Sequence, residues 1–102
     1  MPIALFNFVR ALKISRFTID VLMQRLEQLN EGERCVGLMH ESVASCERLH
    51  NRLCARMSGL QDLDDYAMAS LNAEFGELQH NISESIARLK SFELGARKAR
   101  EF

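Results

Sequence analysis

The sequence has little of what most non-helical folds require. Among 102 residues there are one proline, five glycines, no tryptophan, one tyrosine and six phenylalanines. This composition argues against the turn-rich texture of an all-β sandwich and against collagen-like or low-complexity material. Hydrophobic residues make up 47% of the chain and charged residues 26%, which is the range of one ordinary soluble domain and leaves no room for a second. We therefore expect an all-α protein that forms one helical domain over residues 1–102.

The chain also lacks an excess of charge of either sign. Lysine and arginine together number 13 and aspartate and glutamate 14, for a formal net charge of -1. This balance excludes a whole-molecule field that would draw the protein to nucleic acid or to anionic lipid, so any such binding has to be local. We expect neither nucleic acid nor a membrane surface to be the partner.

The few cysteines and the absence of long apolar runs bear on the compartment of the cell in which the protein resides. Cys35, Cys46 and Cys54 fall within one predicted helix, where a straight helix cannot bring most of these pairs together in a disulfide. Free thiols of this kind fit a reducing cytoplasm. No apolar run approaches the roughly 20 residues that span a bilayer. The apolar segment 1–14 carries its basic residues late and no small-residue cleavage site follows, so we expect an unprocessed, cytoplasmic chain.

Apolar residues recur every three or four positions over three long segments, which predicts three amphipathic helices. The predicted helices cover about residues 3–29, 33–58 and 62–94, and residues 95–102 lose the pattern and are expected to form a frayed tail. The first stripe is Leu5, Phe8, Leu12, Ser15, Ile19, Leu22, Leu26 and Leu29. The second stripe is Val36, Met39, Val43, Cys46, His50, Leu53, Met57 and Leu60. The third stripe is Leu63, Ala67, Leu71, Phe75, Leu78, Ile82, Ile86, Leu89 and Phe92.

Glycines and capping residues separate the three stripes. Gly32, with Asn30 and Glu33 as a capping pair, marks the first break. Gly59 followed by an Asp62 cap marks the second. Short breaks make neighbouring helices antiparallel, so the expected architecture is an elongated three-helix bundle, up, down, up, with coiled-coil-like packing. The alternative is a long hairpin that carries an extra N-terminal segment.

The first predicted helix is apolar on both sides. Opposite the stripe that begins at Leu5 lies a second apolar face. This second face consists of Ile3, Phe6, Ile14, Phe17 and Val21. A three-helix bundle buries one stripe per helix, so the second face is left for another copy, a different protein or a lipid surface. The intramolecular alternative is a kink near Ser15 that folds the helix back on itself.

Basic residues keep the lipid alternative open. Arg10, Lys13 and Arg16 precede the first acidic residue, Asp20, and an amphipathic helix with such residues can lie on anionic lipid. They do not gather on one face of the helix, which weakens this alternative.

Two thiols and an imidazole form a row with a spacing of four residues: Cys46, His50 and Cys54. Thiolate and imidazole at i and i+4 can share one zinc ion, and His80 is the other histidine that could approach. The row spans about 12 Å of helix, so all three side chains cannot easily reach one metal. We interpret Cys46 and His50 as core residues, with His50 fixing the register of an apolar seam, and we expect no metal and no cofactor.

A like-charged row lies beside that seam and consists of Arg48, Arg52 and Arg56. Like charges four residues apart repel, so acidic counterparts are expected. An antiparallel third helix would bring Asp64 and Asp65 close to Arg56, and Glu74 toward Arg48. The alternative is contact with the phosphates of RNA or DNA, although no aromatic residue is interleaved to stack on bases.

No catalytic motif accompanies these features. The sequence contains no glycine-rich phosphate loop, no Gly-x-Ser-x-Gly, no His-Glu-x-x-His and no Cys-x-x-Cys, so we do not expect an enzyme. We predict a protein–protein interaction module that works as a small adaptor, chaperone, assembly factor or inhibitor and also forms homo-oligomers. The apolar anchors on the second face of the first helix supply affinity, and flanking charges select the partner. The alternative function is a small dimeric regulatory nucleic-acid-binding bundle that uses the arginine row.

Overall fold

Three helices make up nearly all of the described chain. The computed structural model describes residues 3–29, 34–60 and 63–100, with the side chains of 3, 4, 34, 35 and 96–100 left undescribed. Helix α1 spans Ile3–Glu27, α2 spans Arg34–Gly59 and α3 spans Asp65–Arg100. The described residues contain no strand. The all-α prediction is therefore confirmed.

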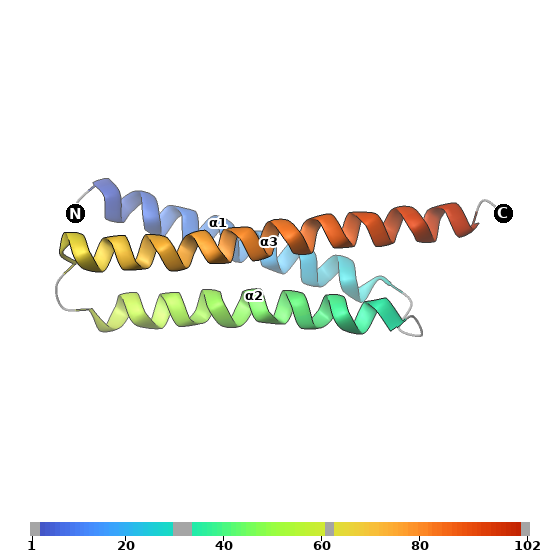
Figure 1. The fold of residues 1–102 in the computed structure, drawn as a ribbon, viewed down its shortest axis with the longest axis horizontal. Helices are drawn as coiled ribbons and strands as arrows, with labels where there is room; N and C mark the ends of the chain where they lie inside the picture. The colour runs from blue at the N-terminus through green and yellow to red at the C-terminus, as the bar shows by residue number, and fades with distance from the viewer. Residues whose placement is uncertain (1–2, 30–33, 61–62, 101–102) are drawn as a thin grey trace.

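The helices run up, down and up in an elongated bundle (Figure 1). The molecule measures 58 × 20 × 18 Å along its principal axes, because three long helices lie side by side instead of forming a globule. Helix α2 packs against both α1 and α3, and α1 crosses α3 obliquely (Figure 1). The three-helix bundle is confirmed, with α1 packed along the α2–α3 hairpin.

The boundary between α2 and α3 differs from the prediction. Helix α2 ends at Gly59, next to the predicted end, but α3 begins at Asp65, later than predicted. Asp64 is the capping residue, since its Oδ1 accepts a hydrogen bond from the backbone N–H of Ala67 at 2.8 Å. The predicted caps at Asn30 and Asp62, with Gly32 and Glu33, lie outside the described residues.

The predicted end of the third helix at residue 94 is wrong. Helix α3 continues to Arg100, although the apolar pattern stops earlier. Residues 96–100 are alanine, arginine and lysine, which are strong helix formers and favour continuation of the helix without an apolar pattern. Gly95 adopts no left-handed conformation that would end the helix, since the described glycines have no positive φ.

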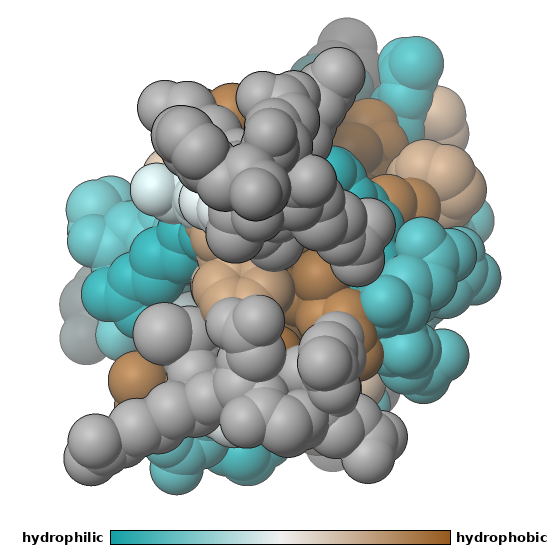
Figure 2. Space-filling view, turned by 90° about the vertical axis from the view of Figure 1, so that its right-hand side faces the viewer, coloured by the Kyte–Doolittle hydropathy of each residue, from teal (hydrophilic) through white to brown (hydrophobic). Residues whose placement is uncertain are grey.

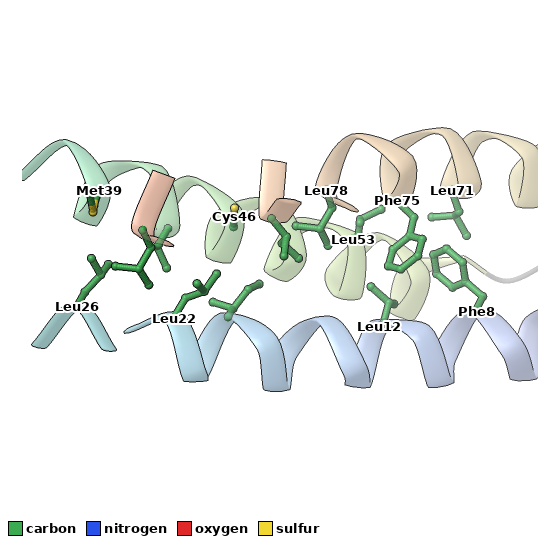
Figure 3. Packing of buried hydrophobic residues seen from close by; sticks show 14 residues of the cluster. Phe8, Leu12, Leu22, Leu26, Met39, Cys46, Leu53, Leu71, Phe75 and Leu78 are labelled. Carbon is green, nitrogen blue, oxygen red and sulfur yellow. The ribbon is translucent and has the colours of Figure 1, made fainter. Parts of the chain in front are cut away.

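The core follows the predicted stripes closely. Large side chains from all three helices meet along the axis of the bundle (Figure 3). The rings of Phe8 on α1 and Phe75 on α3 pack edge to face, with centroids 5.5 Å apart. Viewed along the bundle from the end of α3, hydrophilic residues cover the flanks and hydrophobic residues show between the helices (Figure 2). Buried apolar area of this kind is the main stabilising term of the fold.

Polar groups buried in the core are hydrogen-bonded across helices. Nε2 of His50 on α2 lies 3.1 Å from the backbone oxygen of Leu12 on α1, so His50 joins these two helices, and its predicted position in the core is confirmed. In α3 the third stripe is partly wrong, because the buried residue is Ser85 and the adjacent Ile86 is half-buried. Ser85 fits at the α2–α3 contact, where its hydroxyl lies 2.7 Å from that of Ser42.

Candidate interaction surface

The outward side of α1 carries a concentration of exposed apolar side chains. Six large hydrophobic residues are exposed in the described part of the chain, and three of them lie on α1. These three are Phe6, Ile14 and Phe17, with exposed fractions of 57%, 59% and 71%. They project away from the side of α1 that buries Phe8 and Leu12. Val21 is half-buried, and the side chain of Ile3 lies outside the described part of the chain. We call Phe6, Ile14, Phe17 and Val21 the outer face of α1.

The fold-back alternative for this helix is wrong. Helix α1 is unbroken from Ile3 to Glu27, and Ser15 lies within it as a buried residue. A small side chain at this point of the stripe fits between packed helices without bending the backbone. The outer face of α1 is therefore not covered by α1 itself.

Charged residues divide the solvent-exposed side of α1 into a basic and an acidic half. Arg10 and Lys13 are exposed beside the outer face and form no ion pair with any described residue. Asp20 and Glu27 are exposed in the second half of the helix. Arg25, the basic residue nearest to Glu27 in the sequence, forms an ion pair with Glu93 on α3. The N-terminal half of this side therefore carries the basic residues Arg10 and Lys13, and the C-terminal half carries the acidic residues Glu27 and Asp20, of which Asp20 is paired with Arg16.

Arg16 lies between the two halves and is already engaged. It pairs with Asp20 one turn later on the same helix, and its Nη2 lies 3.7 Å from Oε2 of Glu47 on α2. Both hydrogen bonds from Arg16 to Asp20 end on Oδ1 of the carboxylate. The hydrogen bond from Arg16 lowers the pKa of Asp20, and the same contact raises the pKa of Arg16. Asp20 is thus an exposed carboxylate whose Oδ2 has no hydrogen bond to a described residue.

The arginine row on α2 finds a counterpart, but not the predicted one. Arg52 and Arg56 both reach Oε1 of Glu74, at 3.3 and 2.6 Å. Arg56 also donates a hydrogen bond of 2.6 Å to Ser70. The prediction that Glu74 faces Arg48 is wrong, because α3 begins later than expected and its residues are displaced along α2.

The predicted pairing of Arg56 with the acids at the start of α3 is wrong for the same reason. Asp64 and Asp65 form no ion pair with a described residue. Burial of Glu74 opposes its charge, but hydrogen bonds from Arg56 and Arg52 outweigh this effect and lower its pKa. Two of the three arginines therefore share the single negative charge of Glu74, and Arg48 is exposed without an ion pair to a described residue.

The thiol and imidazole row lies mainly in the core. Cys46 is fully buried, and burial raises the pKa of its thiol. Sγ of Cys54 lies 3.9 Å from both ring nitrogens of His50. His80 is on the surface, 3.3 Å from Glu84, and does not approach His50. No three His, Cys, Asp or Glu side chains within residues 3–29, 34–60 and 63–100 are grouped to hold a metal ion. The side chain of Cys35 is not among those that the structure describes.

A groove between α2 and α3 was not predicted from the sequence. Its volume is about 930 Å³, and its walls combine Leu38 and Phe92 with polar residues such as Ser42, Arg48 and Arg88. Small serine side chains on both helices leave this space open. The serines on the two predicted helices, Ser42, Ser45 and Ser91, are the sequence signal that could have indicated the groove. Glu41 and Glu84 line the groove beside the two arginines, so its charge has no single sign.

Comparison with known protein families, with curated proteins and with solved structures gave no match to this chain. Within the described residues, no helix contains a stretch long and apolar enough to cross a membrane.

Proposed function

We propose that this protein is a non-enzymatic protein–protein interaction module that binds through the outer face of α1. The observation that supports this proposal is the 71% exposure of Phe17, with Phe6 and Ile14 exposed on the same side of one helix. Exposed large apolar side chains that gather in one place mark interaction sites on soluble proteins. Helices bind protein grooves through anchors at this spacing, and neighbouring charges then select the partner.

The proposed class includes small adaptors, chaperones, assembly factors and inhibitors of larger proteins. All of these act by covering or presenting a helix face, and none requires a catalytic centre. A cytoplasmic location belongs to the proposal because the cysteines fit a reducing compartment. The coiled-coil packing that the heptad stripes predict, and an oligomeric state, belong to it as well.

Photo-cross-linking tests this function. A photo-reactive phenylalanine analogue replaces Phe17 in the full chain, and the matched control carries it at Tyr66, an exposed aromatic position on α3. We expect protein adducts from position 17 and not from position 66. Any captured protein, including this chain itself, is then purified and its affinity measured for wild type, Phe17→Glu and Tyr66→Glu.

The two glutamate variants decide the outcome. The proposal requires that Phe17→Glu abolish binding and that Tyr66→Glu leave it unchanged. Equal cross-linking from both positions, or equal loss of binding in both variants, would contradict it. So would a captured protein that binds Phe17→Glu as tightly as wild type.

A further inference from the structure

We propose that the outer face of α1 binds a second copy of this chain, with the two α1 helices antiparallel and a two-fold axis beside Phe17. This inference rests on the proposed function and names its occupant. It follows from the distribution of charge along α1 together with the positions of the exposed apolar residues.

The charges of α1 select the antiparallel orientation. The basic residues Arg10 and Lys13 precede Phe17, whereas the acidic residue Asp20 follows it. A parallel pair would place Lys13 against Lys13 of the second copy, and like charges directly opposed are unfavourable. An antiparallel pair places the positive half of each helix against the negative half of the other. Charge complementarity therefore favours a second copy over a partner of unrelated charge.

The positions around Phe17 fix the register. Lys13 lies four residues before Phe17 and Asp20 three after it, while Ile14 lies three before and Val21 four after. With about 100° of rotation per residue, Lys13 and Asp20 project to one side of Phe17, and Ile14 and Val21 to the other. A two-fold axis perpendicular to both helix axes places the residues on one side of Phe17 opposite the residues on that same side in the second copy.

In this register apolar residues face apolar residues, and Lys13 faces a residue of opposite charge. Phe17 meets Phe17 of the second copy at the axis. Ile14 meets Val21 twice on one side, and Lys13 meets Asp20 twice on the other. Oδ2 of Asp20 has no hydrogen bond to a described residue, because both bonds from Arg16 end on Oδ1, so it can accept a bond from Lys13.

The small size of the contact is typical of weak, transient complexes. One helix from each copy buries less surface than the roughly 1,200–2,000 Å² of stable complexes. We therefore expect a reversible dimer whose Kd is roughly ten to several hundred micromolar, and closed two-fold symmetry limits the assembly to two chains.

Sedimentation equilibrium of the full chain over a concentration series tests this arrangement. Wild type is compared with Lys13→Glu, Asp20→Lys and the double variant Lys13→Glu/Asp20→Lys. Each single variant opposes like charges at two symmetric places, so we expect Kd to rise about three- to tenfold. The double variant restores opposite charges, so its Kd returns toward the wild-type value. Lys90→Glu makes the same charge change on an exposed site of α3 and leaves Kd unchanged.

The outcomes separate this inference from the proposed function. Recovery in the double variant supports the antiparallel dimer. If Phe17→Glu disrupts the dimer but the double variant does not restore the wild-type Kd, the proposed register is overturned. A chain that stays monomeric at every concentration would overturn the dimer, while capture of a different protein at position 17 would leave the proposed function standing. Binding of the monomer to vesicles of phosphatidylserine and phosphatidylcholine, lost in Phe17→Glu, would assign the face to a membrane and overturn both.

Discussion

Ser42 on α2 and Ser85 on α3 join their hydroxyl groups across the bundle at 2.7 Å, and Ser85 is buried. Ser85 also donates a hydrogen bond of 2.9 Å to the backbone oxygen of Asn81. A second polar contact, from His50 to the backbone of Leu12, joins α2 to α1. Polar contacts in the interior thus join α2 to each of its two neighbours, in addition to apolar packing. Such contacts favour one register over others that would leave a polar group unsatisfied.

Replacing Ser85 by alanine tests the α2–α3 contact. We expect Ser85→Ala to lower the free energy of unfolding by about 1 kcal/mol, since a buried hydrogen bond is lost. Ser83 is exposed on the same helix, and Ser83→Ala does not lower stability because alanine is the better helix former. Urea unfolding followed by circular dichroism measures both. Equal stability of the two variants would contradict the role of Ser85.

The carboxylate of Glu74 makes the stability of the bundle depend on pH. Its pKa is lower in the folded chain than in the unfolded one, so it stabilises the fold above the ordinary glutamate pKa, near 4.3. This contribution is lost as pH falls through the lowered folded value. We expect Glu74→Gln to lose less stability than wild type between about pH 5 and 3. Urea unfolding at several pH values measures this, with Glu77→Gln on the exposed side of α3 as the control. An acid-induced loss in Glu74→Gln equal to that of wild type would show that the Arg52 and Arg56 contacts do not stabilise the fold.

Phe17 and Leu12 lie on opposite sides of α1 and should respond differently to substitution. Leu12 is buried in the core, and Leu12→Ala is expected to cost about 2–5 kcal/mol of unfolding free energy. Phe17→Glu is expected to change the stability of the monomer by no more than about 0.5 kcal/mol, because the side chain is exposed. Thermal and urea unfolding at low protein concentration measure both. A large loss in Phe17→Glu would show that Phe17 stabilises the fold.

The arginine row gives a prediction about nucleic acid. Arg52 is already paired with Glu74, so we expect the purified protein to carry no nucleic acid and Arg52→Glu to change stability only. The chain has no tryptophan and one tyrosine, so bound nucleic acid would dominate the absorbance at 260 nm. An excess at 260 nm that Arg52→Glu removes, without a change in melting temperature, would favour the nucleic-acid alternative.

The buried side of each helix could be predicted because its cause is local. A period of three and four residues decides which side chains face a neighbouring helix, and Phe8, Ile19 and Leu53 are buried as that period requires. The exposure of Phe6 and Phe17 followed from the same reasoning, since one side of a helix can be buried in a bundle while the other cannot.

The relative positions of residues on different helices could not be predicted in the same way. They depend on the turn between α2 and α3, which sets how far one helix slides along the other. Glu74 therefore meets Arg52 and Arg56 instead of Arg48. Ser85 is buried and Ile86 only half-buried for a related reason, since a stripe can step by three or four and only the packing partner, here Ser42, decides which.

The most direct test of the interaction surface is light scattering in line with size exclusion, over loading concentrations from about 10 µM to 1 mM, which bracket the expected Kd. For wild type, we predict a molar mass that rises with concentration from that of one chain, 11.7 kDa, toward twice that value. Phe17→Glu is predicted to remain at the mass of one chain throughout, and Tyr66→Glu to follow wild type. A wild-type mass that stays at one chain over the whole series, or a Phe17→Glu profile identical to that of wild type, would contradict self-association through the outer face of α1.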